Sequence, residues 1–304
     1  MNRFTFIINP IAGNVLSSGI INKLSALESS DPENYKVIFT ERPAHATAIA
    51  KNLTKNSFAT NIVAVGGDGT INEIINGFNL NSPSSLAVLP YGSGNDVSRF
   101  LYKKHSKFLE TIIKPDLTET MTYDIGIAEI IDANENVIRK KFINAVGIGF
   151  DAYVAYLNQH EKVLSGIPSY LIAVLKALKS STGIDMKILI GNKMITQKCL
   201  LVTIGNGKTS GGGFFLNPDA DPTDGELNIT TVEFGPRSEI LRNLPFALIN
   251  KLHRVKKARF YKGNSICLEL SSPYYVHLDG EIASKEAVKI KVKLNGKIKI
   301  MREK

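Results

Sequence analysis

Residues 61–70 read Asn-Ile-Val-Ala-Val-Gly-Gly-Asp-Gly-Thr and are followed at once by the amphipathic stretch Ile71 to Phe78. An apolar run, a glycine turn and a helical pattern in this order predict a strand, a tight turn and a helix. At such a junction glycine lets the backbone approach a ligand closely, and the free N–H groups of the helix N-terminus favour phosphate. The stretch therefore predicts a phosphate-binding turn in an α/β domain.

Asp68 is the informative residue of this turn. A carboxylate in an anion-binding loop would repel phosphate unless a cation such as Mg²⁺, or a polarised hydroxyl, lay between the two. The alternative interpretation is an ordinary turn between a strand and a helix, in which Thr70 caps the helix. The local sequence alone leaves both open.

Three other apolar runs end in comparable turns. Phe4 to Asn9 leads into Asn9-Pro10-Ile11-Ala12-Gly13, Tyr35 to Thr40 closes on Thr40, and Leu86 to Leu89 precedes Gly92-Ser93-Gly94-Asn95-Asp96. In open α/β folds, ligands bind at the edge formed by the carboxyl ends of the strands. Four such ends at one edge predict a ligand site there.

The chain has 304 residues, and at about 150 residues per domain this favours two domains. Residues 1–120 alternate β-branched runs with amphipathic stretches such as Val15 to Glu28, which predicts an α/β nucleotide-binding domain with a mostly parallel sheet. Residues 121–304 predict a mainly antiparallel β-sandwich, from short segments that include Arg139 to Val146, Ser265 to Leu270 and Tyr274 to Leu278. A return of the last residues to the first domain is compatible with the sequence but does not follow from it.

The composition narrows the class of protein. Lys plus Arg total 37 and Asp plus Glu 28, a net charge of +9 that favours anionic partners: nucleic acid, anionic lipid or nucleotide phosphates. No apolar stretch approaches the ~20 residues of a spanning helix, and the N-terminus lacks the blocks of a signal peptide, so we expect a cytoplasmic protein. Cys199 and Cys267 read as core residues, and none of the five histidines, His277 among them, has metal or triad spacing.

Familiar phosphate-binding motifs are absent from the sequence. Gly207-Lys208-Thr209 resembles the end of a P-loop, but Val202 stands where that motif needs glycine. No complete G-x-G-x-x-G occurs, nor the His-Arg-Asp and Asp-Phe-Gly triplets of protein kinases. A less common nucleotide site remains.

The second half holds three groups of carboxylates. The loop from Asn217 to Glu226 carries four acidic residues, which suit a hard cation or an Asp-rich turn with ordinary side-chain bonding. Asp279-Gly280-Glu281 follows an apolar strand; the Asp-Gly pair predicts a turn, and Glu281 is a candidate base. Asp124, alone near the domain junction, reads by itself as a cap or turn residue.

Together these residues resemble the diacylglycerol kinase catalytic family, which also includes sphingosine, ceramide and bacterial lipid kinases. The resemblance covers essentially the whole chain, through Asn9 to Gly13, Gly66 to Glu73, Gly92 to Arg99, Asp224-Gly225 and Asp279 to Glu281. Gly-Gly-Asp-Gly-Thr alone also occurs in NAD kinases; Gly-Ser-Gly-Asn-Asp points to the lipid branch.

The resemblance implies an ATP site in a cleft between the two domains. Glu281 would be the base that takes the proton of the lipid hydroxyl, while Asp68 and Asp124 would position catalytic Mg²⁺ and water. A second, structural Mg²⁺ would be held by Asp221, Asp224 and Glu226, partly through backbone oxygens. The residues expected to hold the nucleotide are Asn9, Pro10, Ile11, Ala12, Gly13, Thr40, Gly66, Gly67, Asp68, Gly69, Thr70, Ile71, Asn72 and Ser93.

The expected activity is ATP- and Mg²⁺-dependent phosphorylation of the free hydroxyl of diacylglycerol or a related lipid alcohol. The basic run Lys251 to Lys262 has six cations and no acid, which suits either a solvated face or peripheral contact with the anionic inner face of the membrane. Nucleic acid is not expected as a partner, since a binding motif is lacking. The alternatives are a kinase of a soluble acceptor such as NAD and a non-catalytic nucleotide- or membrane-binding regulator. A homodimer is compatible with the sequence, which does not determine the oligomeric state.

Overall fold

The computed structural model describes residues 3–55, 58–102, 107–160 and 167–304. The chain forms two compact units: Met1–Tyr123 with Gly296–Lys304, and Asp124–Asn295. Two long strands, β5 (Thr118–Asp132) and β13 (Glu281–Glu303), contribute residues to both units. Among the described residues, no helix has both the length and the apolar character needed to cross a membrane.

The first unit is built on a parallel sheet. Its strands are β1 (Arg3–Ile8), β2 (Tyr35–Phe39), β3 (Thr60–Gly66) and β4 (Ser85–Pro90), in the order β4-β3-β1-β2. The end of β13 joins the sheet parallel to β4, with Ile300 beside Leu86. The last residues of the chain therefore belong to the first unit.

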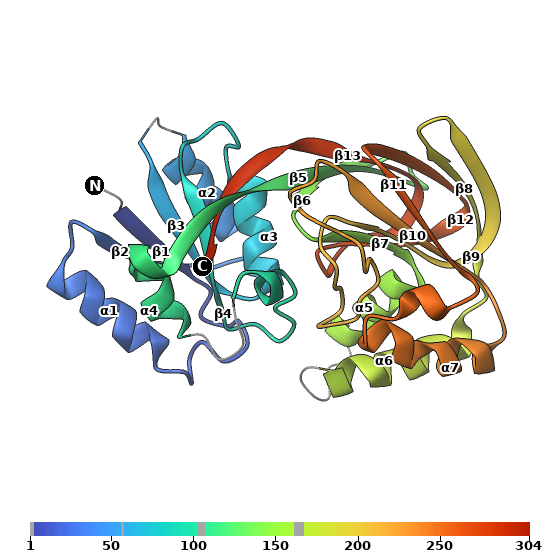
Figure 1. The fold of residues 1–304 in the computed structure, drawn as a ribbon, viewed down its shortest axis with the longest axis horizontal. Coiled ribbons are helices and arrows are strands. Elements are labelled where there is room, and N and C mark those ends of the chain that lie inside the picture. The colour runs from blue at the N-terminus through green and yellow to red at the C-terminus, as the bar shows by residue number, and fades with distance from the viewer. Residues whose placement is uncertain (1–2, 56–57, 103–106, 161–166) are drawn as a thin grey trace. The chain divides into compact units, whose positions relative to one another are not determined.

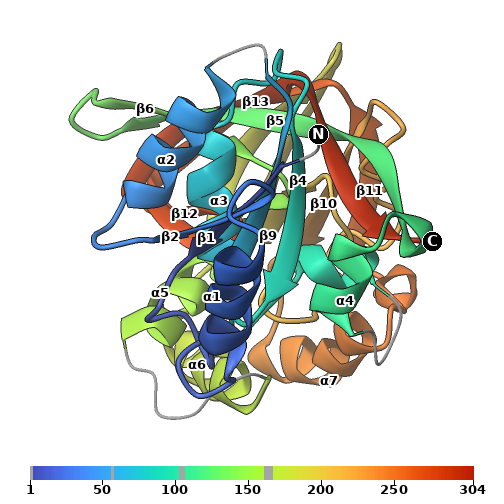
Figure 2. The same ribbon diagram turned by 90° about the vertical axis from the view of Figure 1, so that its left-hand side faces the viewer.

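Helices cover both faces of this sheet (Figure 1). On one face, α1 (Ile20–Ser30) and α4 (Phe108–Ile113) share a core with alternate strand residues such as Phe6 and Ile8; Figure 2 shows α1 in front of the strands. On the other lie α2 (His45–Thr54) and α3 (Asp68–Gly77). The short helices η1 (Val97–Phe100) and η2 (Pro115–Leu117) complete the unit. Because successive side chains of a strand point to opposite faces, the continuously apolar β1 and β3 can be covered on both sides.

The second unit is mainly antiparallel β structure. Strands β9 (Lys193–Gly205) and β12 (Ser265–Leu278) are long enough to pair with different neighbours along their length. Residues 186–190 and 146–148 both pair with β12, and residues 184–190 and 145–149 both pair with β9. Its apolar side chains form a core between the strands. The strands are β5, β6 (Val137–Phe142), β7 (Ala145–Gly149), β8 (Ile184–Ile190), β9 (Lys193–Gly205), β10 (Leu227–Glu233), β11 (Ala258–Gly263), β12 (Ser265–Leu278) and β13.

Three helices gather at one end of the second unit (Figure 1): α5 (Phe150–His160), α6 (Ile167–Ser180) and α7 (Arg237–Leu248), with η3 (Leu252–Arg254). They share a second core with the outer side of β9 and β10. The fold is thus the expected combination of an α/β domain and a β-sandwich-like domain.

Three local predictions differ from the structure. The helix predicted from Val15 begins at Ile20, because residues 10–19 form turns and Gly19 has a φ of 69°. The strand predicted over Arg139 to Val146 is two strands, broken at residues 143 and 144. The segments 265–270 and 274–278 form one strand, β12, because a register shift against β13 absorbs the residues between them.

Candidate functional site

The turns after the four parallel strands lie at one edge of the first sheet. Asn9 donates its backbone N–H to Val65 of β3 at 3.0 Å, and Tyr91 donates to Gly66 at 2.9 Å. The N–H of Thr40 reaches the carbonyl of Ile8 at 2.8 Å. The parallel register thus brings the predicted nucleotide residues of the four turns to a common edge.

Glycine is required where these turns approach one another. A Cβ on Gly92 would lie 2.2 Å from the Cα of Gly67, and a Cβ on Gly13 would lie 2.0 Å from the carbonyl oxygen of Tyr91. Gly13 also has a φ of 44°, a conformation that other residues adopt only at a cost. Glycine at these positions therefore lets the turns pack closely against one another, and the partly exposed backbone of Gly67 and Gly92 lies at the edge where a phosphate is expected.

Side chains within this edge connect the turns. The amide of Asn9 donates to the hydroxyl of Thr70 at 3.2 Å and its carbonyl oxygen accepts from the N–H of Ile11 at 3.3 Å. The helix α3 has Gly67 at its N-cap and no side-chain cap, so the alternative in which Thr70 caps this helix is wrong. Ser93 and Ile11 are exposed, while Ile71 and Asn72 are buried.

Asp68 occupies the first turn of α3 and is partly exposed. Its carboxylate accepts the backbone N–H groups of Asp96 at 3.0 Å and Val97 at 3.3 Å. These bonds fix the carboxylate against the Gly92–Asp96 turn and orient it at the edge where the phosphate is expected. Asp68 thus joins two of the predicted nucleotide turns.

In the second unit, Asp124 is buried against the acidic loop. One carboxylate oxygen accepts from the N–H of Gly225 at 2.8 Å, and its own N–H donates to the carbonyl of Pro222 at 2.7 Å. Asn206, fully buried, donates both amide hydrogens, to the carbonyl of Asp124 at 2.8 Å and to that of Ile143 at 2.7 Å. Asp124 is therefore held rigidly, at 2% exposure.

Lys262 supplies one positive charge to the carboxylates of the acidic loop. Its ammonium lies 2.9 Å from Oδ2 of Asp224 and 3.0 Å from Oε2 of Glu226, and these bonds raise the pKa of Lys262. Asp221 accepts from the N–H and hydroxyl of Thr223, which lowers the pKa of Asp221. Over the described ranges, no three or more Asp, Glu, His or Cys residues are grouped as a metal site requires. A cation held jointly by Asp221, Asp224 and Glu226 does not fit this arrangement unless Lys262 moves away, so the structural Mg²⁺ stays a prediction.

The turn Asp279–Gly280 joins β12 to β13, with Leu278 paired to Glu281. Both turn residues have positive φ, 51° and 87°, as a two-residue type I′ hairpin requires. The buried carboxylate of Asp279 accepts the N–H groups of Ile143 at 3.0 Å, Asn144 at 2.9 Å and Ala145 at 3.0 Å. This clamp explains the break between β6 and β7, and it leaves Glu281 exposed on a fixed turn.

Several residues of this region were not predicted from the sequence. Asn206, Gln159 and Lys262 contact Asp124, Glu281 and the acidic loop, and His277 pairs with Asp151 behind the Asp279 turn. Their partners lie between 36 and 126 residues away along the chain, so no spacing reveals them. The one signal in the sequence is that His277 lies two residues before Asp279, in the strand that leads to the predicted turn.

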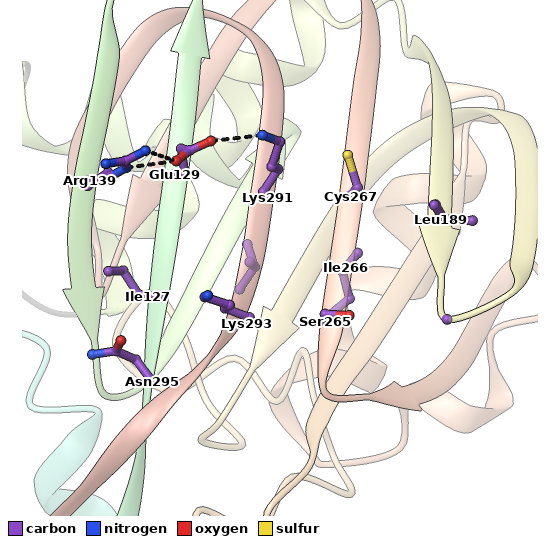
Figure 3. Close-up of a pocket in the computed structure, with 12 residues that line it drawn as sticks. Ile127, Glu129, Arg139, Leu189, Ser265, Ile266, Cys267, Lys291, Lys293 and Asn295 are labelled. Carbon is purple, nitrogen blue, oxygen red and sulfur yellow. Dashed lines mark hydrogen bonds and ion pairs between the residues drawn. The ribbon is translucent and has the colours of Figure 1, made fainter.

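A cavity of about 500 Å³ lies on another part of the second unit (Figure 3). Glu129 binds Arg139 at 2.7 Å and Lys291 at 2.9 Å at its wall, and these bonds lower the pKa of Glu129. None of the predicted site residues lines this cavity. The predicted site residues therefore fall into two groups: the glycine turns and Asp68 lie in the first unit, and Asp124 and Glu281 lie in the second.

Two family models match the chain. The diacylglycerol kinase catalytic domain matches residues 3–126, and the YegS C-terminal NAD kinase beta sandwich-like domain matches residues 144–301. The chain belongs to the diacylglycerol kinase catalytic family. As a member of this family the protein is a lipid kinase. Membership in a kinase family implies that ATP is the phosphoryl donor.

Individual members of the diacylglycerol kinase family are similar along the whole chain. A diacylglycerol kinase of Bacillus subtilis is 27% identical over 92% of this chain and 90% of its own. The crystal structure of a diacylglycerol kinase from Bacillus anthracis superposes with a TM-score of 0.74 at 22% identity, covering 99% and 97% of the two chains. Yeast NADH kinase, with a TM-score of 0.55 at 12% identity over 100% and 84%, shares the fold.

Proposed function

We propose that this lipid kinase transfers the γ-phosphoryl group of ATP, with Mg²⁺, to the free hydroxyl of diacylglycerol or a closely related lipid alcohol. The product would be phosphatidic acid or its analogue. The observation that carries the proposal is the placement of Glu281, an exposed carboxylate on a clamped hairpin in a chain matched by the family along both units. The relatives named diacylglycerol kinase support the choice of substrate.

The first unit contains backbone groups that can bind the phosphates of a nucleoside triphosphate. Phosphoryl transfer depends mainly on positioning and on neutralising charge. The glycine turns present partly exposed backbone, and the N-terminus of α3 adds N–H groups and a favourable dipole. The hydrogen bond between Asn9 and Thr70 would hold two of the turns in fixed positions beside the phosphates.

The carboxylates of Asp68 and Asp124 are hard oxygen donors of the kind Mg²⁺ prefers. Asp68 is partly exposed at the glycine-lined edge, so its residue type and place fit such an ion. Asp124 is buried and hydrogen-bonded by Gly225, and would act from a fixed position. When bound, Mg²⁺ supplies neutralisation of the phosphate charge; the chain's own part is to orient the two carboxylates.

Glu281 would accept the proton of the attacking lipid hydroxyl. Gln159 donates to its Oε2 at 3.2 Å and thereby orients the carboxylate. A general base must lie within hydrogen-bond reach of the proton it removes, and an exposed side chain on a rigid turn can meet a substrate that arrives from outside.

A kinase acting on a bilayer lipid must reach the membrane surface, and the basic run Lys251–Lys262 is the proposed contact. Two of its lysines are engaged within the chain, Lys257 with Glu239 at 2.9 Å and Lys262 with the acidic loop. Lys251, Arg254, Lys256 and Arg259 remain as the cations for anionic lipid headgroups, at about 1 kcal/mol each near the surface.

A direct test offers the purified chain ATP and Mg²⁺ with vesicles containing diacylglycerol, and in parallel with NAD in solution. We expect the ³²P of γ-³²P-ATP to appear in a lipid product. Label in NAD alone would favour a soluble acceptor, to which the fold shared with yeast NADH kinase gives some support. Omission of anionic lipid should slow the reaction if the basic run makes the contact.

A further inference from the structure

Asp151 and His277 form a buried ion pair or hydrogen bond that the proposed mechanism does not use. Nε2 of His277, on β12, lies 2.9 Å from Oδ2 of Asp151, in the first turn of α5, and the two side chains are 1% and 2% exposed. Gly147 makes room for the pair, because a Cβ there would lie 2.1 Å from Nε2 of His277. A polar pair at this depth is costly to bury and is seldom justified by stability alone.

The partners of the imidazole fix its tautomer. The backbone N–H of Gly280 donates to Nδ1 of His277 at 3.2 Å, so Nδ1 is the acceptor and Nε2 carries the hydrogen that Asp151 accepts. The hydroxyl of Tyr170, on α6, donates to Oδ1 of Asp151 at 3.0 Å. A directed chain of hydrogen bonds thus runs from α6 through α5 to the backbone of the residue before Glu281.

The other end of α5 holds the same turn. Gln159 donates to the carbonyl oxygen of Gly280 at 2.9 Å and to Oε2 of Glu281 at 3.2 Å. The N–H of Gly280 is therefore tied to α5 through His277, and its carbonyl directly through Gln159. The helix α5 thus holds both the N–H and the carbonyl of Gly280. Glycine can adopt many backbone conformations, and these contacts hold Gly280 at a φ of 87°.

We propose that His277, held by Asp151, and Gln159 are positioning residues that fix the carboxylate of Glu281 for proton removal. This inference rests on the proposed function of Glu281. Two apolar residues could fill the space of the Asp151–His277 pair as stably, but they could not accept the N–H of Gly280. Small displacements of a catalytic group cost large factors in rate, so the effect should appear in kcat rather than in nucleotide binding.

Two substitutions separate the two bonds of the imidazole. In His277→Gln the amide nitrogen can replace Nε2 and keep Asp151 paired, while the acceptor for Gly280 is lost. In His277→Asn the side-chain oxygen can replace Nδ1 and keep the bond to Gly280, while Asp151 loses its partner. Because both variants are of similar size and polarity, each is the control for the other.

We expect His277→Gln to lower kcat by about 10-fold, with the KM for ATP and the melting temperature close to wild type. His277→Asn should lower the melting temperature but keep kcat within about threefold. Should kcat follow stability in both variants, or remain unchanged in His277→Gln, the positioning role is overturned.

Gln159→Ala tests the second contact without a folding risk, since Gln159 is exposed. Its kcat should fall by about 10-fold with the KM for ATP unchanged, and an unchanged kcat would remove Gln159 from the proposal. Wild type and Glu281→Gln are measured alongside on diacylglycerol vesicles. No lipid product from wild type would refute the proposed function, whereas an active wild type, an inactive Glu281→Gln and fully active His277→Gln and Gln159→Ala would refute this inference alone.

Discussion

The ammonium of Lys262 lies 2.9 Å from Oδ2 of Asp224, inside the loop where the family resemblance implies a metal ion. Lys262 also contacts Glu226, so two of the three proposed ligands already have a cation. The single ammonium charge neutralises part of the charge of the two carboxylates and, unlike Mg²⁺, imposes no octahedral geometry on the loop. The chain thus supplies part of the positive charge that this loop needs.

Replacing Lys262 by methionine should make the loop depend on a divalent cation. The wild-type melting temperature should be insensitive to EDTA, while Lys262→Met should melt about 2–4 °C lower and recover when Mg²⁺ is added. Differential scanning fluorimetry with and without Mg²⁺ measures both effects. A wild-type protein that is itself destabilised by EDTA would contradict this prediction.

The raised pKa of Lys262 also gives a pH signature. A group whose pKa is higher in the folded state stabilises that state below its unfolded pKa and loses this contribution as pH rises through the folded value. The difference in stability between wild type and Lys262→Met should therefore be constant at neutral pH and, as pH rises, should shrink only under strongly alkaline conditions. A difference that shrank between pH 6 and 8 would point to another group.

Asp279 should matter for stability as well as for the hairpin. Asp279→Ala removes the acceptor of three buried N–H groups and leaves alanine at a positive φ, so we expect a loss of about 3 kcal/mol or more in the free energy of unfolding. Asp279→Asn keeps a side-chain oxygen and tolerates this backbone conformation, and should lose less. Urea unfolding compares them; equal losses would show that the hydrogen bonds to residues 143–145 are unimportant.

Gly92→Ala should weaken nucleotide binding without unfolding the chain. The added Cβ would meet the backbone of Gly67, so the two glycine turns must separate. Isothermal titration with ATP should show at least a 10-fold loss of affinity, about 1.4 kcal/mol. Gly263→Ala is the control and should bind normally, because its added Cβ would lie 3.0 Å from the γ2 methyl of Ile190 and 3.9 Å from the carbonyl oxygen of Ser265, neither of which belongs to the glycine turns. Normal binding by Gly92→Ala would remove this edge as the nucleotide site.

The two cysteines should differ in reactivity. Burial raises the pKa of Cys199 to about 11, and its side chain is 0% exposed, whereas Cys267 is partly exposed. Because the thiolate is the nucleophile, a thiol reagent at pH 8 should label Cys267 in the folded protein and Cys199 only after unfolding. Mass spectrometry of labelled peptides decides this, and rapid labelling of Cys199 would contradict its buried position.

The sequence predicted the first unit well because its signals are local. Each of the four parallel strands is an apolar run that ends in a turn, and the carboxyl ends of parallel strands necessarily meet at one edge. The start of α1 was misplaced because Val15, although buried, belongs to a turn that precedes the helix, and periodicity does not distinguish the two. The residues that form the edge were thus available from the sequence, but the contacts between them were not.

The second unit was predicted less completely because its decisive contacts are distant along the chain. Asp279 interrupts the strand predicted over residues 139–146 from about 135 residues away, and Lys262 reaches the acidic loop from another strand. His277 had no neighbour in sequence to suggest a partner, since Asp151 lies 126 residues earlier. In an antiparallel sandwich, the order of the strands decides which distant residues become neighbours. A single sequence does not reveal that order.

The most direct test of the account is the transfer of γ-³²P from ATP to diacylglycerol in vesicles by wild type and Glu281→Gln, measured side by side with ATP affinity. We predict labelled phosphatidic acid from wild type, a loss of at least about 100-fold in Glu281→Gln, and equal ATP affinity in the two proteins. Comparable rates in both proteins would contradict the role of Glu281, and no labelled lipid from a wild-type protein that binds ATP would contradict diacylglycerol as the substrate.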